Sequence, residues 1–171
     1  MRAFIIGFMC SGKSVVGREL ARLTGCRFAD IDRVVEQRIG PILPWMRQHG
    51  EARFREVEGE VLADLLLQED VLVACGGGTP MAADNMDRML AAGEVVYLDV
   101  PHRTLLERAR RSGGDRPLLH GLHGDALEHR ILELMRVREP VYRRATLHVP
   151  GGGTPAETAL QVAGLLGLQV K

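Results

Sequence analysis

The start of the chain constrains the fold more than any other part of the sequence. The apolar run Ala3–Ile6 is typical of a buried strand, residues Gly7–Ser14 match G-x-x-x-x-G-K-S, and Val15–Leu23 has helical periodicity. Glycines let backbone N–H groups approach an anion closely, and the first turn of a helix adds unpaired N–H groups and the positive end of a dipole. This order of strand, glycine loop and helix predicts a P-loop, a site for nucleotide phosphates.

Two residues of the P-loop have specific expected roles. Lys13 would reach the β- and γ-phosphates, and the Ser14 hydroxyl would bind Mg²⁺. Of the 22 basic residues only Lys13 and Lys171 are lysine, so lysine stands at the one internal position where a compact point charge is needed. The other residues expected to contact ATP here are Gly7, Cys10, Ser11, Gly12 and Val15.

Length and composition restrict the remaining possibilities. With 171 residues, 46% of them hydrophobic, the chain is expected to form a single domain. A formal net charge of zero argues against nucleic-acid or membrane-surface binding and favours small-molecule partners. The chain is expected to be a monomer. Cys10, Cys26 and Cys75 are far apart, which indicates reduced thiols in a cytoplasmic protein. No apolar run approaches the roughly 20 residues that span a bilayer.

The chain alternates strand-like and helix-like segments, which predicts a parallel sheet covered on both faces by helices. Strands are expected at 2–7, 26–30, 71–75, 95–99 and 146–149, and helices at 13–24, 31–39, 43–49, 54–68, 83–91, 102–111, 125–143 and 155–166. Ligands of such sheets bind beyond the carboxyl ends of the strands, so the residues that follow each strand are the candidates for function.

Asp30 and Asp32 follow the second predicted strand. One carboxylate would hold Mg²⁺, commonly through water, and the other would accept or orient the proton of an attacking hydroxyl. The alternative interpretation is that Asp32 caps a helix beginning at Arg33. The spacing alone leaves both interpretations open.

Arg55 and Glu58 lie three residues apart on a predicted helix. The carboxylate could hold the guanidinium in one orientation for bidentate binding of an anionic substrate. A solvated surface pair, worth about a few tenths of a kcal/mol, explains the spacing equally well. After the third strand, Gly76–Gly78 would let backbone N–H groups touch a ligand where a side chain would collide.

A polar, glycine-hinged segment at about 112–124 has the character of a mobile lid that closes over phosphates and excludes water. Arg116 in this segment would stabilise charge on the transferred phosphoryl group. A further arginine, Arg138, lies near the end of the helix that follows the lid.

Taken together, these motifs resemble the shikimate kinase family, in order and at the expected separations over roughly residues 1–165. The motifs that carry the resemblance are Gly7-Phe8-Met9 with Gly12-Lys13-Ser14, Asp30-x-Asp32, Gly50-Glu51-x-x-Phe54-Arg55-x-x-Glu58, Gly76-Gly77-Gly78, Arg116-Pro117-Leu118-Leu119 and Arg138-x-Pro140-x-Tyr142. The resemblance implies a three-layer α/β/α P-loop kinase with a central, mostly five-stranded parallel sheet. It also implies transfer of phosphate from ATP to the 3-hydroxyl of shikimate, on the route to chorismate and the aromatic amino acids.

The resemblance implies a role for each matching residue. Asp32 would bind the substrate hydroxyl and act as its base or orienter, while Lys13 and Arg116 would stabilise the phosphoryl group. Mg²⁺ would be held by Ser14 and Asp30, the shikimate carboxylate by Arg55 and Arg138, and the rest of the acceptor by the backbone of Gly76, Gly77 and Gly78.

The chain departs from the family pattern in its nucleotide contacts. Cys10 stands where the family usually has glycine, so the loop needs a conformation that a side chain tolerates. Adenine would lie near Arg110 or Arg111, and the loop at 150–155 lacks the arginine that some relatives place over the base, so discrimination between ATP and GTP would be loose. Alternative functions are another P-loop kinase, of aminoshikimate or gluconate type, or a non-catalytic module that senses ATP or shikimate.

Overall fold

Five parallel strands form one sheet in the computed structural model, which describes residues 1–112 and 116–171. The strand order is β2-β3-β1-β4-β5, and every neighbouring pair is parallel. The strand bounds are β1 (Arg2–Ile6), β2 (Arg27–Asp30), β3 (Val71–Ala74), β4 (Glu94–Asp99) and β5 (Leu147–Pro150). The predicted five-stranded parallel sheet is confirmed.

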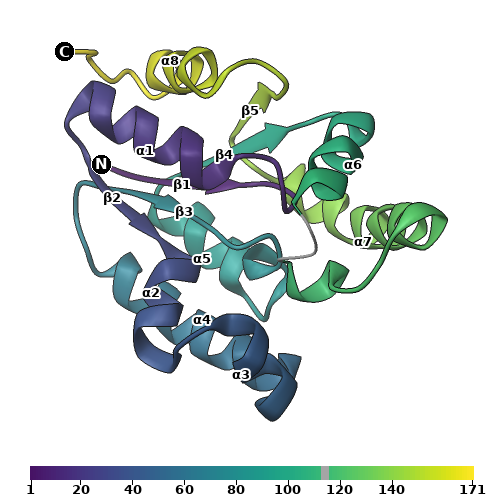
Figure 1. Ribbon diagram of the computed structural model, residues 1–171. Helices are drawn as coiled ribbons and strands as arrows, with labels where there is room; N and C mark the ends of the chain where they lie inside the picture. The colour runs from purple at the N-terminus through teal and green to yellow at the C-terminus, as the bar shows by residue number, and fades with distance from the viewer. Residues whose placement is uncertain (113–115) are drawn as a thin grey trace.

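Helices cover both faces of this sheet. In Figure 1, α1 and α8 lie together on one face, whereas α4, α5 and α7 lie on the other. The helix bounds are α1 (Lys13–Thr24), α2 (Ile31–Ile39), α3 (Ile42–His49), α4 (Glu51–Leu66), α5 (Asn85–Ala92), α6 (His102–Arg111), α7 (Gly124–Tyr142) and α8 (Pro155–Leu165), with 3₁₀ turns η1 (Thr79–Met81) and η2 (Pro117–Leu119). Within residues 1–112 and 116–171, no helix combines the length and apolarity needed to cross a bilayer.

The apolar strands divide their side chains between two cores. Ala3 and Ile5 pack with residues of α1 and α8, whereas Phe4 and Ile6 pack with residues of α2, α4, α5 and α7. Alternate residues of a strand point to opposite faces, and both faces are buried, so β1 is apolar throughout. The two cores fix the sheet rigidly beneath the loops at its carboxyl edge.

The strand order brings three predicted functional segments to one edge. The P-loop follows β1 in the middle of the sheet, Gly76–Gly78 follow the adjacent β3, and Asp30 ends β2. Strand β1 has β3 on one side and β4 on the other, and a crevice forms at such a reversal in strand order. The functional cavities therefore lie beside the P-loop.

One local prediction was wrong, and one alternative interpretation is excluded. Helix α4 begins at Glu51 rather than near residue 54, because Gly50 adopts φ 85° and turns the chain directly into the helix. Helix α2 begins at Ile31 with Asp30 as its N-cap, so Asp32 lies inside the first turn and does not cap a helix beginning at Arg33. The predicted lid at 112–124 includes residues 113–115, which lie outside the described residues. In the described part of that segment, Leu119 is buried in the core.

Candidate active site

The P-loop runs from the end of β1 into the first turn of α1. Gly12 caps α1 with φ 93°, and Cys10 also adopts a left-handed φ of 66°. A side chain tolerates that conformation at a cost of about 1–2 kcal/mol, whereas glycine adopts it freely. Arg108 of α6 stabilises the loop, because its Nη1 donates to the carbonyls of Cys10 and Ser11, each at 3.2 Å.

Lys13 lies inside the loop rather than on the surface. Its side chain is buried, and Nζ donates to the carbonyl of Phe8 at 2.9 Å. Burial lowers the pKa of Lys13 to about 8, although the nearby Asp32 carboxylate acts to raise it. The hydroxyl of Ser11 is also buried and has no hydrogen-bond partner in residues 1–112 and 116–171. A buried ammonium and an unsatisfied hydroxyl in one loop are suited to a phosphate group.

A cavity of about 310 Å³ lies on one side of the P-loop, and the side chain of Arg108 forms part of its lining. The other side chains and glycines that line it are Cys10, Ser11, Gly12, Val15, Val16, Leu98, Gly151, Gly152, Gly153, Pro155 and Thr158. Arg110, one of the two arginines predicted near adenine, instead pairs with Glu128 of α7 at 3.7 Å. Arg111 is exposed and does not line this cavity.

Sequence reasoning missed Arg108. The signal was present in the periodicity of α6, because Leu105 and Ala109 are its buried residues and Arg108 lies beside them on the inner side of the helix. Arg110 follows Ala109 on the outer side and is exposed. The helical periodicity of burial therefore distinguishes Arg108 from Arg110, although composition alone cannot do so.

A second cavity, of about 500 Å³, lies on the other side of the P-loop and collects the predicted acceptor residues. Its lining includes Ser14, Val15, Asp30, Asp32, Arg55, Glu58, Gly76, Gly77, Gly78, Arg116 and Arg138. Most of these residues come from α1, β2, α2, α4, α7 and the loop after β3. Segments that are distant in sequence thus meet at one hollow, as the predicted pocket requires.

Asp30 and Asp32 occupy different environments. The side chain of Asp30 accepts a hydrogen bond from the backbone N–H of Arg33 at 3.4 Å, which is the capping bond of α2. Burial raises the pKa of Asp32 to about 6, and the negative charge of Glu58 also acts to raise it, whereas Lys13 acts to lower it. Asp32 is therefore a carboxylate with a base strength suited to proton transfer near neutral pH.

The pair formed by Arg55 and Glu58 is largely buried, which excludes the surface-pair interpretation. Glu58 is fully buried, and its Oε2 accepts from Arg55 Nη1 at 2.8 Å. Arg55 also donates to Glu51 at 3.2 Å. A Cβ at Gly78 would overlap the guanidinium of Arg55, so this glycine makes room for it. Arg55 is thus held in one orientation over the glycine loop.

Arg138 is a second arginine in the same cavity, and it is buried. Its Nη1 has no hydrogen-bond partner in the part of the chain that the structure describes. The guanidinium lies 5.8 Å from the centroid of the Phe8 ring and borders Gly77. The Tyr142 hydroxyl donates to the Gly77 carbonyl and fixes the loop beneath it. A buried cationic N–H without a partner is costly, and an anionic ligand would supply the missing acceptor.

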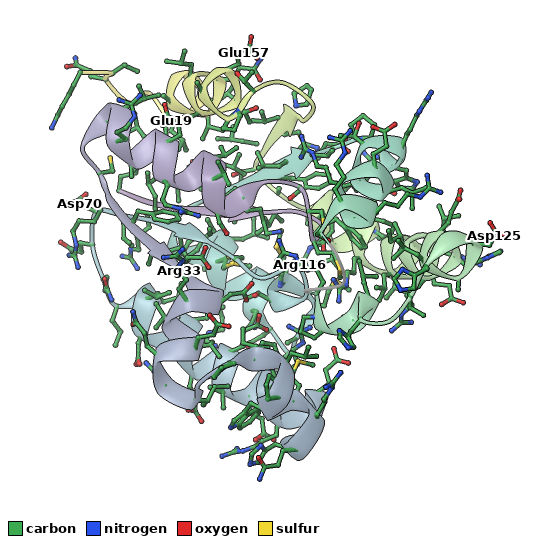
Figure 2. All side chains as sticks on the ribbon, viewed as in Figure 1. Glu19, Arg33, Asp70, Arg116, Asp125 and Glu157 are labelled. Carbon is green, nitrogen blue, oxygen red and sulfur yellow. The ribbon has the colours of Figure 1, made fainter. Side chains whose placement is uncertain are left out.

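Arg116 approaches the same centre from the segment before η2. It is exposed, yet its positive charge acts to lower the pKa of both Lys13 and Asp32. Figure 2 shows Arg116 in the middle of the molecule near the start of α1, whereas Asp70, Asp125 and Glu157 lie at the periphery.

Oxygen ligands for a hard cation are present at this centre. The Ser14 hydroxyl and the Asp30 and Asp32 carboxylates line the second cavity next to the P-loop. Within residues 1–112 and 116–171, no cluster of three or more His, Cys, Asp or Glu side chains is arranged around a metal position. The donor set fits Mg²⁺, which is usually bound by one or two protein oxygens together with waters and substrate phosphates.

Comparison with known proteins identifies the family. The shikimate kinase family model matches residues 9–164. A shikimate kinase of Thermus thermophilus is 40% identical over 158 residues, which is 92% of this chain and 84% of the relative. The chain belongs to the shikimate kinase family.

Solved shikimate kinase structures agree with this assignment. The enzyme from Bacteroides thetaiotaomicron superimposes with a TM-score of 0.91 at 30% identity, covering 98% of this chain and 99% of that one. The shikimate kinase from Acinetobacter baumannii, solved in complex with shikimate, gives a TM-score of 0.88 at 33% identity, covering 96% of this chain and 92% of that one. The fold predicted from the family resemblance is confirmed.

Proposed function

We propose that this protein is a shikimate kinase, which transfers the terminal phosphoryl group of ATP to the 3-hydroxyl of shikimate. The observation that carries the proposal is the presence of two guanidiniums, that of the partly buried Arg55 and that of the buried Arg138, in the same cavity as the carboxylate of Asp32. Shikimate carries a carboxylate, which the guanidiniums could bind, and several hydroxyls, one of which could bind to Asp32. The family membership and the likeness to a shikimate-bound relative support the same acceptor.

The second cavity would hold the acceptor. Arg55 and Arg138 would bind the carboxylate of shikimate, since the unpaired Nη1 of Arg138 gains an acceptor in this way. Asp32 would accept the proton of the 3-hydroxyl, and Gly76–Gly78 would let the ring lie against the backbone. The hydroxyl oxygen then bonds to the γ-phosphorus while the bond from that phosphorus to the β–γ bridging oxygen breaks, and ADP leaves.

The P-loop and the first cavity would hold ATP. Lys13 would exchange its bond to the Phe8 carbonyl for phosphate oxygens, and Arg116 would stabilise the charge of the phosphoryl group during transfer. The remaining loop residues would contact the phosphates, and Arg108 would border the nucleoside. Mg²⁺, held by the Ser14 hydroxyl and by Asp30 through water, would neutralise part of the phosphate charge.

A coupled assay of ADP formation tests the proposal. Purified protein with MgATP is expected to release ADP only when shikimate is added, and gluconate or a nucleoside monophosphate should support far slower turnover. Equal turnover with gluconate would contradict the acceptor assignment. Binding of ATP and shikimate without ADP formation would instead identify a sensing module.

The oligomeric state and the location of the protein are part of the proposal. We infer that it acts as a monomer, since one chain supplies both the P-loop and the proposed acceptor residues Asp32, Arg55 and Arg138. We infer a cytoplasmic location from its three free cysteines. Sedimentation of the purified protein at assay concentrations checks the first inference.

A further inference from the structure

Thr79 lies behind the acceptor cavity and does not line it. It begins η1 just after Gly76–Gly78, and its side chain is fully buried. Its backbone is fixed at both ends, because its N–H donates to the Gly76 carbonyl at 3.2 Å and its carbonyl accepts from Asn85 Nδ2 at 2.9 Å. The hydroxyl of Thr79 is therefore held in one place by the turn.

That hydroxyl donates to Glu58 Oε1 at 2.6 Å, while the other oxygen of Glu58 accepts from Arg55 at 2.8 Å. The two bonds use the two oxygens of one carboxylate, so they define its plane. A fully buried carboxylate that loses one of these partners must turn to find another, because leaving an oxygen unsatisfied in the interior is costly. Rotation of the carboxylate would move Oε2, the atom that accepts the hydrogen bond from Arg55.

We propose that Thr79 is a positioning residue for the acceptor, acting through Glu58 to fix the orientation in which Arg55 binds the acceptor carboxylate. The inference rests on the proposed function, since it assumes that Arg55 binds the carboxylate of shikimate. Bidentate binding of a carboxylate depends on the angle of the guanidinium plane, which explains why a residue that does not touch the substrate would control its affinity.

Thr79→Val tests this role, because valine keeps the shape of threonine and removes the hydroxyl. We expect the KM for shikimate to rise by roughly tenfold or more, as for a lost hydrogen bond to a charged group, while the KM for ATP stays within about twofold. Thr79→Ser should restore most of the shikimate affinity, since serine keeps the donor. Thr24→Val, which removes a hydroxyl bonded to the Leu20 carbonyl at the end of α1, is the matched control and should leave both KM values unchanged.

A double variant separates positioning from general stability. In an Arg55→Ala background, Thr79→Val should add little to the KM for shikimate, because its effect passes through Arg55. An equal rise in that background, or equal rises in the KM for shikimate and for ATP, would overturn the proposal. Circular dichroism would show whether Thr79→Val and the smaller Thr79→Ala fold. Loss of the folded state in both variants would overturn the proposal as well. Absence of shikimate-dependent turnover in the wild-type protein would mark failure of the proposed function instead.

Discussion

Asp32 and Lys13 lie close enough to shift each other's pKa, and burial moves the two values toward neutrality. The pKa of Asp32 rises to about 6, and the pKa of Lys13 falls to about 8, with burial the largest cause in each case. Between these values the carboxylate is deprotonated while the ammonium keeps its charge. The proposed reaction needs both states at once, so the two residues define a pH window for it.

Asp32 sets the acid side of that window. Protonation removes the base, so kcat/KM for shikimate should fall as the pH decreases through about 6. Asp32→Asn should lower kcat by about 10²–10⁴-fold while shikimate still binds, because an amide cannot accept the proton. Steady-state rates from pH 5 to 8, with calorimetric titration of the variant, measure both effects. Wild-type rates in the asparagine variant would remove Asp32 from the reaction.

Lys13 sets the upper limit of the pH window. Its ammonium pairs with phosphate, so the affinity for ATP should fall as the pH rises through about 8, and ATP binding above that pH should take up a proton. Calorimetry in two buffers of different ionisation enthalpy detects the proton. Binding of shikimate serves as the internal control, because its carboxylate is proposed to bind guanidinium groups, which stay protonated in proteins, rather than the Lys13 ammonium. An ATP affinity that stays constant up to about pH 9.5, well above the expected pKa, would contradict the role.

Helix α4 and the loop after β3 pack closely enough that a residue of one restricts the residues allowed in the other. Gly78 gives Arg55 its place, since a Cβ there would overlap the guanidinium. Helix α4 contains another glycine, Gly59, around which a Cβ would meet no atom within 4 Å. Replacement by alanine is therefore expected to have opposite effects at these two glycines.

Gly78→Ala should displace Arg55 and raise the KM for shikimate by roughly tenfold or more, with part of the stability lost as well. Gly59→Ala should stabilise the protein by about 0.5–1 kcal/mol and leave the kinetics unchanged, because alanine favours the helix and has free space. Urea denaturation and initial rates of both variants check the pair. Unchanged shikimate kinetics in the Gly78 variant would show that the cavity tolerates a displaced guanidinium.

The proposed acceptor cavity lowers the stability of the ligand-free protein and favours the binding of an anion. Arg138 is 5% exposed and carries a buried N–H without a partner in the described chain, which costs folding free energy until an anion arrives. Shikimate at about 100 times its Kd should stabilise the protein by about 2.7 kcal/mol, a rise in Tm of roughly 5–10 °C.

The matched variant is Arg138→Met, which removes the charge and keeps an unbranched apolar side chain. It should leave the Tm of the free protein equal or higher, because no unpaired charge is buried, and it should abolish most of the shift caused by shikimate. Differential scanning calorimetry with and without shikimate measures both. A full shift in the methionine variant would show that the carboxylate does not bind at Arg138.

Much of this arrangement follows from local sequence signals. The P-loop, the strand ends and the triple glycine were predictable because each depends on a short pattern and on the rule that ligands bind at the carboxyl edge of a parallel sheet. The sequence did not predict that Arg108, rather than Arg110, lines the first cavity, because this depends on which face of α6 packs against the P-loop. The burial of Glu58, and the bond that it accepts from Thr79, depend on contacts between segments that are distant in sequence.

Val15 lines both cavities, so the proposed nucleotide and acceptor sites meet at one side chain. A single compound that joins an adenosine phosphate to a cyclic carboxylate would span this junction, and its second half would bind at the effective concentration set by a short linker. Such a bisubstrate inhibitor would gain affinity from each half without needing either to be tight. The geometry of the junction thus sets the linker length from which inhibitor design should begin.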